Sequence, residues 1–153
     1  MGALLSSLKK TTSTSSNEKS TSSATKMGSV EPLAFQHYAN AQTEFTKTLP
    51  LIANENAFLG DISTSENGPS NPTAPISAGF YRLDPGTPLV YKYTYDEMKI
   101  IVDGDFEISD ESGQTVKAKK GDVFFFPKGS EITFKTEKGG LGFFCGQRAK
   151  DAA

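Results

Sequence analysis

Short runs of β-branched and aromatic residues recur along the chain from residue 31 onward, and clusters of Gly, Pro and Asn separate them. A helical period is hard to find there, whereas short apolar runs bounded by turn residues are typical of a barrel or sandwich of strands. The pattern therefore predicts an all-β domain. The predicted strands cover residues 34–39, 58–63, 77–83, 88–95, 98–103, 105–110, 114–118, 122–126, 131–136 and 141–147.

Turn residues set the expected connections between these strands. Asp-Gly within Val102–Asp105 suits a tight two-residue hairpin, and Gly113, at the end of Asp110–Gly113, supplies a left-handed position for another turn. Residues 66–75 combine prolines with Asn and Gly, which predicts a surface loop. We expect residues 31–65 to add extra strands to the main barrel.

The start of the chain has a different composition. Ser6–Lys26 is a Ser/Thr/Lys tract in which Leu8 is the one large apolar residue. Such a segment buries too little surface to offset the entropy lost on ordering. We therefore expect a disordered tail at residues 1–30 and a single folded domain at residues 31–153.

Three interpretations of this tail stay open. Gly2 followed by Ser6 matches the myristoylation pattern, and an acyl chain there would bind a membrane weakly, with help from Lys9 and Lys10. An organelle transit peptide fits the abundance of Ser but not the lack of Arg. The third is an unmodified, solvated tail, and Met27 is a candidate second start.

Length and charge narrow the classes of function. The chain has 153 residues, a formal net charge of −2 and one cysteine, Cys145. One domain is expected, and without a basic excess nucleic acid is not an expected partner. A lone cysteine forms no intramolecular disulfide, and no run approaches the ~20 apolar residues of a membrane span. We expect a cytoplasmic protein, with membrane association only through Gly2 acylation.

Two segments carry regularly spaced glycines, a proline and a glutamate. Gly86–Gly104 and Gly121–Gly129 are similar to the two motifs of the cupin family, G-x5-H-x-H-x3-4-E-x6-G and G-x5-P-x-G-x2-H-x3-N. Glu97 falls on the family glutamate. The resemblance implies a jelly-roll barrel with its site inside the barrel mouth, and a homodimer.

The metal-binding half of the cupin pattern is missing. With Glu97 on the family glutamate, Tyr91 and Tyr93 stand at the paired histidines, and Ile132 stands at the third. Transition-metal sites usually draw on imidazole, and the sole histidine, His37, lies far from both motifs in sequence. We therefore expect no bound metal and no other cofactor.

Within the cupins, the chain resembles the EutQ-like group of ethanolamine utilisation. The resemblance lies in a motif-bearing core at residues 79–148. The segments are Gly79–Arg82, Tyr93–Met98, Ile108–Gly113 and Phe144–Arg148. An acetate-kinase role ascribed to that group implies phosphoryl transfer, but the chain has no GxxxxGK[ST] phosphate loop.

Strand alternation predicts which side chains share the barrel interior, independently of any family. One face carries Tyr91, Tyr93, Tyr95, Glu97, Lys99 and Ile101. A carboxylate and an ammonium among phenols are costly to bury unless they pair, so this cluster is a candidate site. The alternative is a bulge near Tyr95 that turns Lys99 to solvent.

The candidate site residues follow from this face and its neighbours. Glu97, Tyr93 and Lys99 are expected to be catalytic, with Glu97 as acid or base and a tyrosine donating to a developing oxyanion. The expected ligand-binding residues are Tyr91, Tyr95, Arg82, Ile132 and Phe134. Arg82 either clamps a carboxylate or phosphate, or pairs with Asp84 at the surface.

Two other features are interpreted structurally. Cys145 has no histidine nearby in sequence to activate it, so we expect a small buried apolar residue. Phe124–Phe126 is expected to fill both faces of a buried sheet and to favour a dimer interface.

These observations favour a metal-free, single-domain cupin that binds a small polar or anionic metabolite in its barrel. If it is an enzyme, acid–base chemistry of the isomerase or lyase kind is expected. The alternatives are a non-catalytic binding or scaffold module and phosphoryl transfer as in the EutQ-like group.

Overall fold

The computed structural model describes residues 33–68 and 73–153. The expectations for the tail at residues 1–30, including Gly2 and Met27, lie outside this range. Residues up to Gln36 form a unit separate from His37–Ala153, and the folded unit described below is the second one. Within the described residues, neither helical segment has the length and hydropathy of a membrane span.

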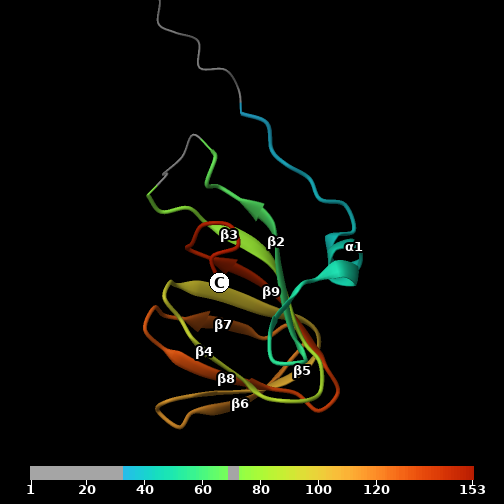
Figure 1. Cartoon of the computed structure of the whole chain (residues 1–153), viewed down its shortest axis with the longest axis vertical. Helices are drawn as coiled ribbons and strands as arrows, with labels where there is room; N and C mark the ends of the chain where they lie inside the picture. The colour runs from blue at the N-terminus through green and yellow to red at the C-terminus, as the bar shows by residue number, and fades with distance from the viewer. Residues whose placement is uncertain (1–32, 69–72) are drawn as a thin grey trace, which may run out of the picture. The chain divides into compact units, whose positions relative to one another are not determined.

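The second unit is almost entirely β-structure, as the sequence pattern predicts (Figure 1). Its elements are α1 (Ala41–Phe45), a 3-10 turn (Thr46–Thr48), β1 (Leu51–Ala53), β2 (Ala57–Thr64), β3 (Ser77–Leu83), β4 (Leu89–Lys92), β5 (Glu97–Asp110), β6 (Thr115–Lys119), β7 (Val123–Phe126), β8 (Glu131–Lys135) and β9 (Gly140–Gly146).

The strands form antiparallel ladders in the order β1-β2-β3-β9-β5-β8-β4, with β6 and β7 also paired to β5. The first half of β5 pairs with β7 and β9, and its second half pairs with β6 and β8. The ladders form two sheets, one of β1, β2, β3, β9, β7 and the first half of β5, and one of β4, β8, β6 and the second half of β5. The long strand β5 belongs to both sheets (Figure 1). The buried side chains form one common core. The core includes Tyr81, Leu83, Leu89, Ile101, Phe106, Ile108, Phe126, Ile132, Phe134 and Phe144.

The predicted hairpin at Val102–Asp105 is wrong, because β5 continues through it. The register against β9 shifts between Ile101 and Asp103, and Gly104 has φ +65°. An Asp-Gly pair suits a bulge as well as a turn, and at this point β5 passes from one sheet to the other. Because residues before and after Val102–Asp105 remain paired with neighbouring strands, this segment is a bend within β5 and not a turn between two strands.

Two other expectations also need correction. Residues 34–39 form no strand, because no ladder pairs them, and the side chain of Phe35 is 91% exposed. Phe124–Phe126 does not fill two buried faces: Phe126 is buried, whereas Phe125 is 54% exposed on the outer face of β7. The turn ending at Gly113 is confirmed, with φ +90°.

Gly104→Ala is expected to destabilise the fold much more than Gly113→Ala. Both glycines have positive φ, which costs an L-residue ~1–2 kcal/mol. A Cβ on Gly104 would also collide with the carbonyl oxygen of Gly139, whereas one on Gly113 meets nothing within 4 Å. Urea unfolding measures the difference, expected at about 1–3 kcal/mol as for overpacking. Equal losses would disprove the close approach.

Candidate active site

The side chains from Tyr93 to Lys99 alternate as predicted. Tyr93, Tyr95, Glu97 and Lys99 are all buried, with Glu97 and Lys99 exposed by only 2% and 4%. The alternative in which a bulge turns Lys99 to solvent is wrong for this structure, because the register shift in β5 comes two residues later. A carboxylate and an ammonium therefore share the barrel interior.

The backbone before β5 is held by the turn of the second glycine-rich segment. The amide of Tyr93 donates to the carbonyl of Ser130 at 2.8 Å, and the amide of Gly129 donates to the carbonyl of Tyr93 at 2.7 Å. The amide of Lys128 donates to Asp96 Oδ1 at 2.7 Å. These bonds place Tyr93 and Glu97 on the interior face without a regular strand between them.

Glu97, Lys99 and Tyr93 form a closed triangle of polar contacts. Lys99 Nζ lies 3.0 Å from Glu97 Oε1. The Tyr93 hydroxyl donates to the same oxygen at 2.8 Å, and Lys99 Nζ donates to the Tyr93 hydroxyl at 3.4 Å. Each charge thus has an opposite charge and a phenol beside it, which offsets part of its desolvation cost.

Three aromatic rings complete the surroundings of the ammonium. Lys99 Nζ lies 4.5 Å from the ring centroid of Tyr81, 4.7 Å from that of Phe134 and 5.4 Å from that of Phe126. Ring faces attract cations, most strongly where water is excluded. The buried ammonium is therefore stabilised by π-faces as well as by the carboxylate.

The cavity beside this cluster is very small. Its volume is about 20 Å³, which is room for about one water molecule. It is lined by Ile52, Leu59, Tyr81, Leu89, Tyr91, Tyr93, Tyr95, Glu97, Lys99 and Phe134. The Tyr81 hydroxyl is buried there without a hydrogen-bond partner. The interior as it stands holds a water-sized group and nothing larger.

The cavity is closed along a line between β1 and β4, which we call the seam. These strands end the sheet order, and no ladder joins them among the described strands. Ile52 and Leu59 approach the cavity from one side, and Leu89 and Tyr91 from the other. The seam is therefore closed by side chains, so opening it breaks no backbone ladder.

Burial and the neighbouring carboxylate keep Tyr81, Tyr93 and Tyr95 protonated. Desolvation, and then the negative charge of Glu97, raises the pKa of Tyr93 and of Tyr81 far above the usual value for tyrosine. The pKa of Tyr95 is raised by the same two causes in the same order. These phenols are therefore hydrogen-bond donors at any physiological pH.

The structure brings together most of the predicted site residues. Glu97, Tyr93, Lys99, Tyr91, Tyr95 and Phe134 all line the cavity. Ile132 is buried in the core opposite Tyr91 in the β4–β8 ladder, but it is not among the lining residues.

Arg82 is not at this site. On β3, Tyr81 and Leu83 are buried, and Arg82 points to the opposite face, where its Nε lies 3.2 Å from Asp84 Oδ1. Its guanidinium also donates to the carbonyl of Thr46. The structure favours the surface-pair interpretation of Arg82 over the ligand clamp.

Sequence reasoning missed Tyr81, whose ring centroid lies 4.5 Å from the ammonium. Its place inside the barrel could have been found by applying strand alternation to residues 77–83. Ile52 and Leu59 had no sequence signal of a role, since only the closure of the barrel brings them to Tyr91.

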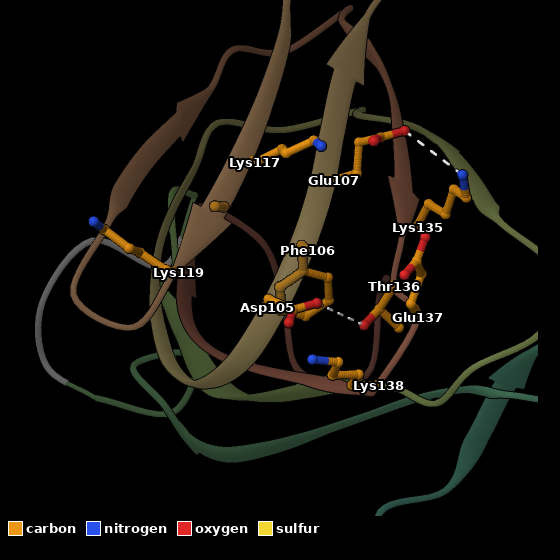
Figure 2. Close-up of a pocket in the computed structure, with 10 residues that line it drawn as sticks. Asp105, Phe106, Glu107, Lys117, Lys119, Lys135, Thr136, Glu137 and Lys138 are labelled. Carbon is orange, nitrogen blue, oxygen red and sulfur yellow. Dashed lines mark hydrogen bonds and ion pairs between the residues drawn. The ribbon is translucent and has the colours of Figure 1, made fainter.

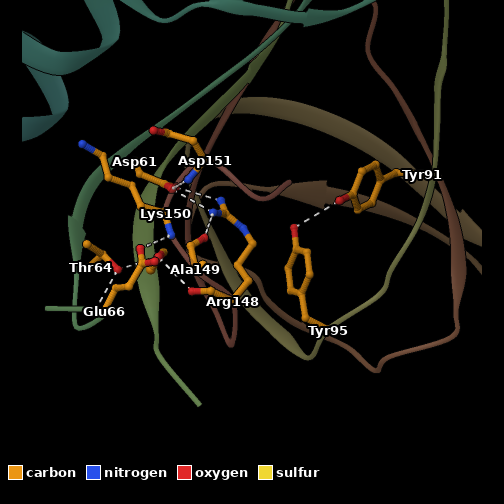
Figure 3. Close-up of polar contacts among 10 residues, drawn as sticks. Asp61, Thr64, Glu66, Tyr91, Tyr95, Arg148, Ala149, Lys150 and Asp151 are labelled. Atoms are coloured by element: carbon orange, nitrogen blue, oxygen red, sulfur yellow. Dashed lines mark hydrogen bonds and ion pairs between the residues drawn. The ribbon is translucent and has the colours of Figure 1, made fainter. Parts of the chain in front are cut away.

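A second buried ion pair lies behind Tyr95 (Figure 3). Arg148 donates to both oxygens of Asp61, at 2.7 and 2.8 Å, and its guanidinium lies 5.4 Å from the Tyr95 ring centroid. Burial alone would lower the pKa of Arg148, but the hydrogen bonds and charge of Asp61 raise it. The Tyr95 hydroxyl lies 3.3 Å from that of Tyr91, so Tyr95 lies between this ion pair and the phenol of Tyr91.

Cys145 and His37 are not among the residues that line the cavity. Cys145 is only half-buried, contrary to expectation, because it lies on the outer face of β9; burial and then the charge of Glu97 raise its thiol pKa. His37 is exposed.

The cluster does not fit the metal of ordinary cupins. Phenols and an isoleucine stand at the histidine positions, and the Glu97 carboxylate is already in contact with an ammonium. Within the described residues, no three His, Cys, Asp or Glu side chains converge on one point. A second cation at Glu97 would meet the charge of Lys99.

The barrel topology, the glycine-rich turns and the placement of Glu97 define a cupin whose histidine ligands have been replaced. The family model for the ethanolamine utilisation protein EutQ matches residues 5–143 of the chain. The chain therefore belongs to the EutQ family.

Solved structures support the same assignment. The chain is similar to ethanolamine utilization protein Q from Salmonella typhimurium LT2, with 32% identity, a TM-score of 0.51, and coverage of 61% of this chain and 71% of that one. For EutQ of Clostridium difficile the identity is 26%, the TM-score 0.51, and the coverage 61% and 68%. Ectoine synthase from P. lautus, at 13% identity and a TM-score of 0.53 over 63% of this chain and 67% of that one, shares the fold alone.

Two curated relatives bear the name acetate kinase EutQ, from Salmonella typhimurium and Escherichia coli K12. Each is 37% identical over 78 residues, which is 51% of this chain. The matched region is 31% and 30% of the relatives' own length. The likeness to these proteins therefore covers less than a third of each of them.

Removing one member of the buried pair is expected to cost more than removing both. Glu97→Gln or Lys99→Met leaves a buried charge without its partner, which typically costs about 3–5 kcal/mol, whereas the double variant leaves none. Urea unfolding of the four proteins measures the coupling. The control is Glu107 and Lys135, an exposed pair at 3.8 Å, for which a coupling of at most about 1 kcal/mol is expected. Additive losses at Glu97 and Lys99 would contradict the pairing.

Tyr81→Phe is expected to make stability less sensitive to alkali. Because the folded-state pKa of Tyr81 is raised, its contribution to stability is complete below the unfolded pKa of about 10 and falls as pH rises above it. Near pH 11, the free energy of unfolding of the parent should therefore fall with rising pH more steeply than that of the variant, by about 1.4 kcal/mol per pH unit. At neutral pH it should be nearly as stable as the parent, because the hydroxyl has no partner. Urea unfolding against pH tests both points, and identical slopes would refute the first.

Proposed function

We propose that this chain is a metal-independent cupin that binds a small polar or anionic ligand at the Glu97–Lys99 pair and carries out acid–base chemistry on it. The observation that supports this most directly is the triangle of Glu97, Lys99 and the Tyr93 hydroxyl, with contacts of 2.8 to 3.4 Å, buried beside a cavity. Buried titratable groups arranged in this way are typical of functional sites.

The three groups have complementary roles in a proton transfer. The Glu97 carboxylate accepts a proton from a C–H next to a carbonyl or carboxylate of the ligand. The ammonium of Lys99 and the hydroxyl of Tyr93 stabilise the negative charge that develops on the ligand oxygen. Protonated Glu97 then returns the proton to another ligand atom, which gives an isomerisation, or to a leaving group, which gives an elimination.

The size of the interior restricts the ligand. A cavity of about 20 Å³ holds about one water molecule, so a metabolite enters only when the seam opens and Ile52 or Tyr91 moves. A small carboxylate fits this requirement best, because its negative end would meet Lys99. Once the seam closes, water is excluded and the charge interactions become stronger.

A non-catalytic binding or scaffold module is the second candidate, and the small cavity favours it. The third is phosphoryl transfer of the kind named for the curated relatives, which match this chain over 30% and 31% of their length. A kinase needs nucleotide binding, so a flat calorimetric titration with ATP and magnesium would exclude this candidate.

Pyruvate, a small carboxylate with acidic C–H bonds, probes the proposed proton transfer. We expect the protein to speed deuterium exchange of the pyruvate methyl group in heavy water, followed by NMR, and Glu97→Gln to lower this rate by ~10²–10⁴-fold. Ile52→Ala, which widens the seam, should raise the rate. Ile100→Ala on the outer face of β5 is the matched control and should leave it unchanged. If Glu97→Gln exchanges as fast as the parent, Glu97 is not the base.

A further inference from the structure

A second hollow lies outside the barrel, against β5, β6 and β8 (Figure 2). Its volume is about 330 Å³, compared with about 20 Å³ for the interior cavity, and it shares no lining residue with that cavity. Small-molecule sites have volumes of about 300–1,000 Å³. The outer hollow is therefore large enough for a small metabolite without any movement of the barrel.

The strand register places charged side chains around the outer hollow. Lys117 on β6 lies opposite Glu107 on β5, and Glu107 lies opposite Lys135 on β8. Two pairs further along the same ladder, Lys119 lies opposite Asp105. Figure 2 shows Lys117 and Glu107 on one side of Phe106, and Lys138 and Asp105 on the other.

Lysines outnumber acidic residues around the outer hollow. Its lining includes four lysines, Lys117, Lys119, Lys135 and Lys138, and three acidic residues, Asp105, Glu107 and Glu137. Of the three acidic residues, Glu107 lies 3.8 Å from Lys135, and Asp105 accepts a hydrogen bond from the Thr136 hydroxyl at 3.4 Å. Among the residues that the structure describes, Lys117, Lys119 and Lys138 take part in none of the ion pairs. Since the whole chain has a net charge of −2, this excess is local.

We propose that the outer hollow binds the phosphate group of a small metabolite through the ammonium groups of Lys117 and Lys138, with Lys119 at its rim. A phosphate has the charge and the acceptor oxygens that lysines bind as point charges. Lys117 and Lys138 line the same hollow from β6 and from the loop after β8, and the proposal requires their flexible stems to turn toward one anion between them. Glu137, the remaining acid, disfavours the anion through its negative charge.

This site goes beyond the proposed function, because it involves neither Glu97 nor the seam. The phosphate would bind on the outer side of the same β5 whose first half carries Glu97 and Lys99. A failure of one proposal therefore leaves the other standing.

An NMR titration of the full chain with inorganic phosphate tests the proposal, with acetate at equal ionic strength as the comparison anion. We expect amide shifts confined to residues 105–107, 117–119 and 135–138, and an affinity about tenfold weaker in Lys117→Gln/Lys138→Gln. The matched control is Lys92→Gln/Lys128→Gln, which removes the same charge from exposed lysines elsewhere and should retain affinity.

Glu137→Gln provides an independent test with the opposite sign. Removing this acid should tighten phosphate binding about threefold, and added chloride should weaken binding in every protein. The proposal is overturned if phosphate causes no localised shifts at millimolar concentration, if acetate causes the same shifts, or if both lysine pairs weaken binding equally. Looser binding by Glu137→Gln would also count against it.

Discussion

The interior of this barrel depends on one constraint, which is that Glu97 and Lys99 are buried together. Two opposite charges taken out of water are tolerated only when each has its partner and further polar contacts. The Tyr93 hydroxyl supplies such a contact at 2.8 Å, and the rings of Tyr81, Phe126 and Phe134 surround the ammonium. The aromatic rings of the core therefore help to stabilise the charge of Lys99 inside it.

The same pair accounts for the chemistry that is absent from the family pattern. Cupins use a glutamate and histidines around a metal ion, whereas this chain keeps the glutamate and places a lysine ammonium 3.0 Å from it. The contact partner of Glu97 in this structure is thus a fixed ammonium of the protein. In the proposed function, this proton-bearing group assists acid–base chemistry at Glu97.

The interior cavity and the outer hollow differ in volume and in the charge of the side chains that line them. The interior cavity, at about 20 Å³, has room for about one water molecule beside Glu97 and Lys99. The outer hollow, at about 330 Å³, is already open and is lined by lysines. Because β5 passes from one sheet to the other at Gly104, a single strand contributes to both places. The first half of β5 lines the interior cavity, and its second half lines the outer hollow.

The sequence by itself determined the all-β class, most strand positions and the inward face of Tyr93, Glu97 and Lys99, because alternation is a local property of an extended chain. Only the tertiary structure decided that the Asp-Gly pair before Asp105 bends β5 rather than ends it, since the ladder partners lie far away in sequence. The same holds for the closeness of Tyr81 to Lys99 and of Ile52 to Tyr91. Contacts between distant segments follow from how the sheets close around a core, and no local pattern records that closure.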